Sequence, residues 1–321
     1  MYQTKLDKKD RKILYQLDTN ARQPNSAIAK KVGLSKDVVN YRIKQLEKEG
    51  FIRGYYTIID FSKLSYFSFR VYLKLFDTTP EIDEEIIDFL IRHPKVFYVA
   101  ETEGLMDIDF GAWVKSIYEF GDFYSEFKQR FNQYVLNQQI SVFTGVHHFH
   151  RAYILNRKFD DNRPKYFGGS EVVKHDKTDI GILRLLAQNS RIPVVEISRK
   201  LKIPAKTAAF RIKQLEKKGI IQDYRFIFDF RLYGYEYYKV DLTLKDISRI
   251  KELTRFAQAH PNILYVDETI AGSDFEFDAE VANKAAFLEL IAAIRKRFPE
   301  IRSYTFFTLR KFDKLLYFPE L

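Results

Sequence analysis

The sequence predicts an α+β protein that contains two copies of one unit, a winged helix-turn-helix domain followed by a ferredoxin-like βαββαβ domain. Three observations favour this fold class. The seven residues Arg42–Lys48 recur unchanged as Arg211–Lys217. Each copy begins with three short helical patterns and an extended tail. Each copy then continues with strand and helix patterns in the order β-α-β-β-α-β.

The repeat extends well beyond those seven residues. His93-Pro94 matches His260-Pro261, so the duplication covers whole halves of the chain. Between the halves, the stretch near 156–174 is polar and contains Pro164 and two glycines, which is typical of a linker. Residues that recur at a constant offset of 169 include Asp7, Asp10, Asn20, Arg22, Pro24, Gly50, Ile52 and Tyr55. We expect winged helix-turn-helix domains over 1–55 and 174–225, ferredoxin-like domains over 56–155 and 226–321, and a linker over 156–173.

The first copy illustrates the helical part of the unit. Apolar side chains at helical spacing predict three short helices, and the third carries Val39, Ile43 and Leu46 on one side. Gly33 separates the second helix from the third, and Ser35 is a favourable N-cap for the third. An extended segment over 52–59 follows. Three short helices with a tight turn before the third are typical of a helix-turn-helix, whose third helix enters the major groove of DNA.

Strands and helices then alternate in each half. In the first half, residues 67–75 alternate apolar and polar as a strand does, and phenylalanines at 120, 123, 127 and 131 mark a helix. Strands are expected over 67–75, 96–102, 108–114 and 139–149, and in the second half over 237–244, 263–269, 275–281 and 303–309.

Composition excludes several classes of site. The chain of 321 residues has no cysteine, so disulfides, thiolate zinc sites and a cysteine nucleophile are ruled out. The charged N-terminus does not resemble a signal peptide, and no run approaches the roughly 18 apolar residues of a membrane helix. We therefore expect a cytoplasmic protein without a membrane partner.

Positive charge is concentrated in the two helical segments. The net charge of the chain is +10, whereas residues 1–55 carry +7, residues 174–225 carry +8 and the remainder carries −5. Local positive charge is what a polyanion requires, because each neutralised phosphate releases counterions. Double-stranded DNA is the expected partner, although an acidic protein would also fit this charge pattern.

At several of these residues the sequence resembles the Lrp/AsnC family of transcription regulators. The match lies in Leu6-Asp7, Asn20-Ala21-Arg22, Gly33-Leu34-Ser35, Arg42-Ile43 and Leu46-Glu47. The resemblance implies promoter binding as dimers or larger assemblies, tuned by an amino acid or a similar small effector. It also implies that the ferredoxin-like domains bind the effector and pair with each other, here within one chain. The second half departs from the pattern where Pro204 replaces the serine cap and Ala271 replaces the turn glycine.

The candidate DNA-binding residues lie on the two recognition helices, the third helix of each copy. Asn can pair with adenine, and Lys can reach guanine or phosphate. Arg42 has two interpretations, a contact with phosphate or a pair with Asp10, and its copy Arg211 has the same two. The second helix keeps its charge but has Ala209 in place of Asn40, which suits phosphates better than bases. The candidates are Ser35, Lys36, Asp37, Asn40, Tyr41, Arg42, Lys44 and Lys48, and in the second copy Lys206, Thr207, Phe210, Arg211, Lys213 and Lys217.

Two turns are candidate effector sites. The resemblance gives this role to Gly104, Leu105, Met106 and Asp107, and more weakly to Ala271, Gly272 and Asp274. An ordinary turn would also explain Asp and Gly there. His147, His148 and His150 suggest a metal, but no acidic or cysteine ligand completes a site, so we expect neither a metal nor a cofactor.

A regulator of transcription is the leading interpretation, and we expect the chain not to be an enzyme. Two alternatives stay open. Some fused proteins of this shape resemble Lrp regulators yet act as siroheme decarboxylases, which need a basic, histidine-containing pocket between the effector-type domains. The positive charge lies elsewhere here, and the second half has no strand motif rich in His and Arg. The other alternative is an architectural DNA-binding protein without an effector.

Overall fold

Capped helices open both halves of the chain. The computed structural model describes residues 6–156, 165–169, 171–316 and 318. In the first half, α1 (Lys8–Thr19) begins with a capping box in which Asp7 and Asp10 each accept a hydrogen bond from the other's backbone N–H. The second half repeats this box at α6 (Lys177–Gln188). The remaining helices of these units are α2 (Asn25–Val32) and α3 (Lys36–Lys48), and α7 (Val194–Leu201) and α8 (Ala205–Lys217).

The two α+β halves close into one barrel. Each half keeps the ferredoxin-like strand order, and hydrogen bonds between β3 and β11 and between β5 and β9 join the halves at both edges. The order around the barrel is β2-β4-β3-β11-β8-β10-β9-β5, and β5 pairs again with β2. The strands of the first half are β2 (Phe67–Leu75), β3 (Val96–Gly104), β4 (Ile108–Val114) and β5 (Val135–His148), and those of the second half are β8 (Glu236–Leu244), β9 (Ile263–Ile270), β10 (Phe275–Val281) and β11 (Ile301–Leu315). The predicted fold class is confirmed.

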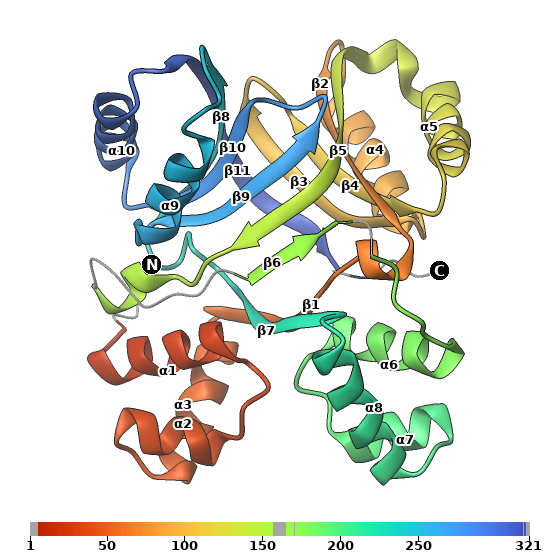
Figure 1. Ribbon diagram of the computed structural model, residues 1–321, viewed down its shortest axis with the longest axis vertical. Helices are drawn as coiled ribbons and strands as arrows, with labels where there is room; N and C mark the ends of the chain where they lie inside the picture. The colour runs from red at the N-terminus through yellow and green to blue at the C-terminus, as the bar shows by residue number, and fades with distance from the viewer. Residues whose placement is uncertain (1–5, 157–164, 170, 317, 319–321) are drawn as a thin grey trace.

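Four helices cover the outside of the barrel (Figure 1). The outward faces of the strands carry two apolar clusters, which include Phe110 and Phe127 in the first half and Phe277 and Phe287 in the second. The helices are α4 (Pro80–Arg92) and α5 (Ile117–Phe131), and α9 (Ile250–Ala259) and α10 (Lys284–Arg297). Because the apolar faces point outward to these helices, the other faces of the strands line the barrel interior.

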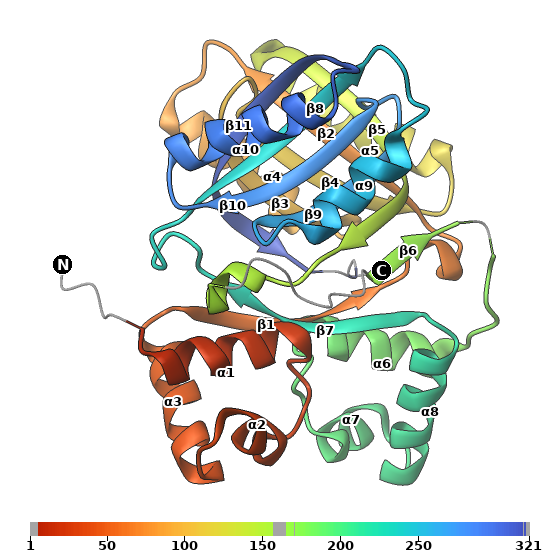
Figure 2. The same cartoon turned by 60° about the vertical axis from the view of Figure 1, so that its left-hand side comes forward.

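A two-stranded ribbon separates the barrel from the helix-turn-helix units. It consists of β1 (Ile52–Ile59) and β7 (Ile221–Phe228), which pair antiparallel with Tyr55 opposite Phe226 (Figure 2). Each strand packs largely against the helices of the other half. Phe226 and Phe228 belong to the core of α1–α3, whereas Tyr56 and Ile58 belong to the core of α6–α8. We call this pair the crossing ribbon; it means that neither helical unit has a complete core by itself.

The segment expected to be a linker contains further structure. Residues 165–168 form β6 (Lys165–Gly168), which pairs with the end of β5, and η3 (Ala152–Leu155) precedes the segment. Residues 157–164 of the segment lie outside the described part of the chain. The boundary expected at 225/226 falls inside β7, because the strand runs on to complete its partner's core.

The two helical units contact the barrel side through different chemistry. On the first side, Arg151 pairs with Asp18 of α1 at 3.0 Å and with Glu280 of β10 at 3.0 Å, and both carboxylates are fully buried. Burial alone would raise the pKa of Asp18, but the charges of Arg225 and Arg151 outweigh burial and hold this pKa below its usual value. On the second side the equivalent positions are Ala187, Phe318 and Trp113, which share one apolar cluster. An ion network therefore joins one unit to the barrel, and apolar packing joins the other.

We predict that Arg151→Met lowers the free energy of unfolding by about 3–5 kcal/mol, because it leaves Glu280 buried without its cation and leaves Asp18 with Arg225 alone, at 3.2 Å. Adding Asp18→Asn and Glu280→Gln should recover part of the loss. The control is Arg92→Met, whose exposed pair with Asp88 contributes at most about 1 kcal/mol. Urea unfolding of the four proteins measures these differences, and a loss no larger than that of the control would contradict the assigned role.

Candidate nucleic-acid interface and barrel cavity

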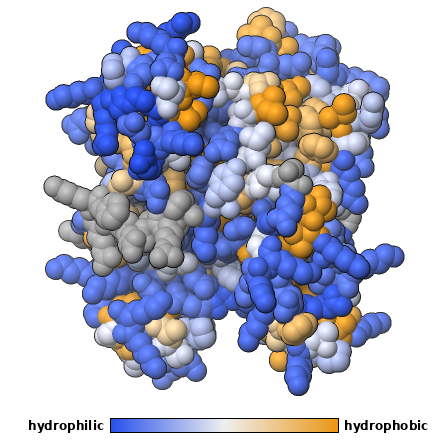
Figure 3. Space-filling view, in the orientation of Figure 1, coloured by the Kyte–Doolittle hydropathy of each residue, from blue (hydrophilic) through white to orange (hydrophobic). Residues whose placement is uncertain are grey.

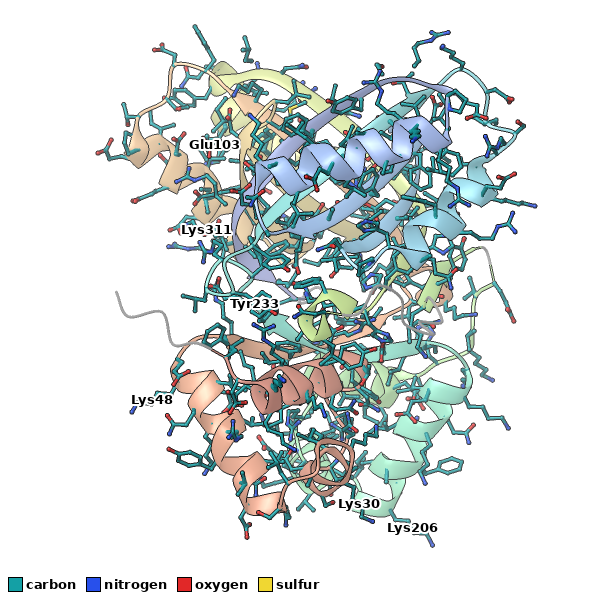
Figure 4. The ribbon with its side chains drawn as sticks, turned by 90° about the vertical axis from the view of Figure 1, so that its left-hand side faces the viewer. Lys30, Lys48, Glu103, Lys206, Tyr233 and Lys311 are labelled. Atoms are coloured by element: carbon teal, nitrogen blue, oxygen red, sulfur yellow. The ribbon has the colours of Figure 1, made fainter. Side chains whose placement is uncertain are left out.

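Both recognition helices lie at the end of the molecule far from the barrel. The N-terminus of α3 is capped by Ser35, whose hydroxyl accepts the N–H of Val38 at 3.2 Å. Pro204 occupies the same position before α8 and provides no side-chain cap. Lys206, at the start of α8, lies at the extremity of the molecule, whereas Lys48, at the end of α3, lies closer to the ribbon (Figure 4). The N-terminal ends, which usually contact bases in this motif, thus lie farthest from the barrel.

Most of the predicted DNA-binding side chains are exposed. Tyr41 is 63% exposed and Phe210 is 60% exposed, although an aromatic ring would normally be buried. Thr207 and Asn40 are half-buried. Hydrophilic residues dominate both units on the face seen in Figure 3. The other exposed members of the predicted set are Ser35, Lys36, Asp37, Lys44 and Lys48 on the first side and Lys206, Lys213 and Lys217 on the second.

Arg42 and Arg211 are engaged within their own units. Arg42 Nη1 lies 2.7 Å from carboxylate oxygens of both Asp7 and Asp10. Arg211 makes the equivalent contacts at 2.7 and 3.0 Å with Asp176 and Asp179. These pairs tie the recognition helix to the capping box of the first helix. Of the two interpretations left open by the sequence, the structure has the internal pair.

A reciprocal pair of arginines joins the two units. Arg22 donates to the carbonyl oxygens of Ser190 and Ile192, and Arg191 donates to that of Ala21 at 2.7 Å. The sequence placed both arginines among the repeated residues but gave them no role. They fix one unit against the other.

Arg191 also reaches a residue beside the recognition helix of the first unit. Its Nη2 donates to Asn25 Oδ1 at 2.6 Å, and Asn25 Nδ2 donates to Asn40 Oδ1. Asn40 is the residue expected to read adenine. The second unit has Val194 and Ala209 at the equivalent positions, so it lacks this chain of hydrogen bonds. Sequence reasoning missed the connection because its members come from three separate segments.

The predicted effector turns lie at the far end of the barrel. Glu103, which precedes Gly104, is in the upper part of the barrel and distant from Tyr233 below it (Figure 4). The carboxylate of Asp107 already accepts two hydrogen bonds, from Lys74 Nζ at 2.8 Å and from the backbone N–H of Leu75 at 2.7 Å. Asp274 accepts the N–H of Leu244, the equivalent contact. Met106 is buried, Leu105 is half exposed, and Ala271 has a positive φ of 63°. The effector role of Gly104–Asp107 and of Ala271, Gly272 and Asp274 stays a prediction.

A cavity of about 130 Å³ lies at the opposite end of the barrel, next to the crossing ribbon. Tyr56, Phe226 and Phe228 of the ribbon contribute to one wall. The charged residues that line it are Arg70, Asp109, His148, Arg151, Lys239, Asp267, Asp278 and Glu280. Apart from His148, which is considered above as a metal ligand, none of these residues is assigned a role by sequence reasoning, because Arg70 and Lys239 are simply polar positions on alternating strands.

Burial and neighbouring charges perturb the titration of these groups. Burial raises the pKa of Asp109 to about 7, although the nearby Arg70 charge acts in the opposite direction. Burial also raises the pKa of Asp278 to about 6, against the effect of Lys239. Burial holds the pKa of His148 well below its usual value, so this imidazole is neutral. His148 packs against the rings of Phe167 and Tyr265, and His147 contacts Glu268 at 3.0 Å.

Comparison with known proteins identifies the helical units. A family described as winged helix-turn-helix DNA-binding matches residues 6–53 and 175–222. The HTH-type transcriptional regulator PH1055 of Pyrococcus horikoshii is 31% identical over 144 residues, which are 43% of this chain and 83% of that protein. The regulator PH1916 of the same organism is 32% identical over 104 residues, which are 32% of this chain and 69% of the relative. LrpA, also from this organism, is 42% identical over 76 residues, covering 24% of this chain and 52% of LrpA.

The whole chain has the fold of an enzyme. The crystal structure of the siroheme decarboxylase NirDL matches with a TM-score of 0.60 and 16% identity, covering 97% of this chain and 94% of that one. NirDL in complex with an iron-uroporphyrin III analogue matches with a TM-score of 0.61. The prediction that the chain is not an enzyme is therefore contradicted. The basic and histidine groups of the cavity come mostly from the first half, as Arg70, His148 and Arg151, whereas the prediction considered such a motif in the second half.

No helix in the described part of the chain combines the length and the apolar character that crossing a membrane requires.

The relatives that match over more than two thirds of their length are HTH-type transcriptional regulators, and the DNA-binding motif occurs twice. The chain belongs to the Lrp/AsnC family of transcriptional regulators, as a tandem duplication of the family's unit.

Proposed function

We propose that the chain binds double-stranded DNA as a sequence-specific transcription regulator, with one chain in the place of a dimer. The observation that carries this proposal is the placement of α3 and α8. Both project from the same end of the molecule, and the crossing ribbon and the arginine pair Arg22 and Arg191 fix their relation (Figure 2). Two recognition helices held in this way suit two neighbouring half-sites.

The two helices differ in what they offer to DNA. The first carries Lys36 and Asn40, where the second has Ala205 and Ala209. Both carry exposed lysines farther along, such as Lys44 and Lys213. Phosphate contacts contribute affinity without sequence information, whereas side-chain amides discriminate between bases. We infer that α3 contacts DNA bases and that α8 mainly contacts the phosphate backbone of the DNA.

Hydrogen bonds that begin in the second unit hold the side chain of Asn40, the residue expected to contact a base. Its Oδ1 accepts a hydrogen bond from Asn25, which in turn accepts one from Arg191. A side chain held by two further residues loses less conformational entropy when it meets a base. The reading of the first half-site thus depends on a residue of the second unit.

We predict an asymmetric operator, with one strongly specified half. Asn40→Ala should reduce discrimination in that half by about 1–3 kcal/mol, because it removes a base-reading amide. Lys213→Ala should weaken binding about equally for all sequences and lower the salt slope by about one. Selection of bound sequences from a random library, with salt titrations of the selected sites, measures both effects. A palindromic consensus with equal information in both halves would contradict the assignment.

We also predict that Asn25→Val lowers base discrimination in the strong half while most of the affinity for non-specific DNA is kept. The variant gives the first unit the residue that the second unit has at this position. Val194→Ala is the matched control in the second unit and should leave discrimination unchanged. Equal effects of the two variants on the selected sequences would show that Asn25 acts only on stability.

Catalysis on a tetrapyrrole is the second candidate function, favoured by the full-length fold match to a siroheme decarboxylase and by Arg70, His148 and Arg151 in the cavity. We rank it second because the lining also includes four carboxylates, which offset the three cations that a substrate bearing carboxylates would meet. Titration of the full chain with iron-uroporphyrin III, followed by absorbance, tests this candidate. A saturable shift would place catalysis first.

A further inference from the structure

The barrel interior holds more carboxylates than cations. Three cations line the cavity: Arg151 pairs with Glu280 at its ribbon end, and Arg70 and Lys239 lie deeper. Arg70 and Lys239 both contact Asp267, at 2.8 and 2.6 Å, and Glu276. Lys239 also lies 3.3 Å from Asp278. Two further carboxylates, Asp109 and Asp241, form no ion pair with any described residue. Apart from the pair of Arg151 and Glu280, five carboxylates thus share two cations in the barrel interior.

The second half of the chain supplies most of the carboxylates that exceed the cations in the barrel interior. Asp267 and Asp278 stand where the first half has Ala100 and Gly111, at an offset of 167. A barrel core formed from two copies of the first half would lack these two acids. Their negative charge is therefore a property of this duplicated chain and not of its repeat unit.

Polar atoms in the cavity wall also lack partners. The Trp113 side chain is 1% exposed, yet its Nε1 has no hydrogen-bond partner in the described part of the chain. Arg70 is 2% exposed, and its Nε likewise has none there. Both residues line the cavity. A buried N–H without an acceptor costs about 1–3 kcal/mol, so these atoms point to an acceptor that a ligand would bring.

The rest of the wall is aromatic. Phe143, Tyr98 and Tyr237 line the cavity from the barrel, and Tyr56 and Phe228 line it from the ribbon. Aromatic faces attract cations as well as apolar groups. A volume of about 130 Å³ is enough for one small organic molecule.

We propose that this cavity binds a small organic cation, a primary amine with an apolar or aromatic body and one hydrogen-bond acceptor. The ammonium group lies among Asp109, Asp267 and Asp278, and the body packs against the aromatic wall. The acceptor takes the N–H of Trp113. An amino acid is disfavoured, because its carboxylate would enter the same acidic region.

Binding of such a cation replaces protons. Asp109 faces Tyr98 of β3, Arg70 of β2, Lys239 of β8 and Asp278 of β10, and burial raises its pKa to about 7. Asp278 faces Lys239 and Tyr237 of β8, Asp267 of β9 and Arg70, and burial raises its pKa to about 6. Below these values the groups are protonated and must release protons to hold an ammonium. Affinity for the amine therefore rises with pH through this range and levels off above about 7.

The ligand would also contact the DNA-binding units through the ribbon. Phe226 and Phe228 line the cavity and belong to the core of α1–α3, and Tyr56 belongs to the core of α6–α8. The site itself does not rest on the proposed DNA binding, and its test does not use DNA.

The experiment compares three probes of similar shape on the full chain by calorimetry: tyramine, 4-ethylphenol, which lacks the amine, and L-tyrosine, which adds a carboxylate. We expect tyramine to bind at least about tenfold more tightly than either of the others. Its affinity should rise about tenfold from pH 5.5 to 7.5, with protons released at the lower pH. Equal binding of tyramine and 4-ethylphenol, tighter binding of L-tyrosine, or no binding of tyramine would overturn the proposal.

Two variants locate the site. Asp278→Asn keeps the shape of the side chain and should weaken tyramine binding at least about tenfold, whereas Asp88→Asn, an exposed acid on α4, should leave it unchanged. The pH series on the unmodified chain tests the proposal even if Asp278→Asn does not fold. Loss of binding in both variants, or in neither, would place the amine elsewhere.

Discussion

The crossing ribbon is the constraint on which the rest of the structure depends. Since β7 supplies Phe226 and Phe228 to the core of the first unit, and β1 supplies Tyr56 and Ile58 to that of the second, neither unit can leave the other without exposing its own core. Fully burying such side chains contributes roughly 1.5–3 kcal/mol each. The same strands set the relation between α3 and α8 and form part of the wall of the cavity. DNA-binding units and barrel are thus parts of one packed body.

Much of the fold could be predicted from sequence, for physical reasons that also explain what could not. Helices such as α3 follow from an apolar stripe at Val39, Ile43 and Leu46 with a Ser35 cap, and both are local signals. Strand β2 was equally visible, because Phe69 and Val71 alternate with Ser68 and Arg70. Alternation predicts one apolar and one polar face, and a polar face is normally in water. Here the apolar face meets the helices, and the barrel closes around the polar face.

The residues of the candidate sites also fall into two groups, those that could be predicted from the sequence and those that could not. The exposed residues of α3 and α8 were found because their positions on a helix follow from spacing alone. The residues that hold Asn40 could not be found in this way. Arg191 is 151 positions away from Asn40, and its hydrogen bond to Asn25 depends on how the two units pack. The cavity residues were missed for a related reason. Closure of the barrel depends on the pairing of β3 with β11 and of β5 with β9, and no local pattern encodes a partner in the other half.

Duplication within one chain removes a restriction that symmetry imposes on a dimer. In a dimer of identical chains, a change in one recognition helix or one barrel half occurs in both. Here Asn40 persists opposite Ala209, an ion network around Arg151 is opposite an apolar contact at Phe318, and Asp278 is opposite Gly111. The paired substitution of Ala100 and Gly111 by Asp267 and Asp278 would, in a symmetric barrel, add four buried acids in place of two. One cation per half, as Arg70 and Lys239 are here, would then face four acids at these positions, so the difference between the two halves limits the number of buried carboxylates.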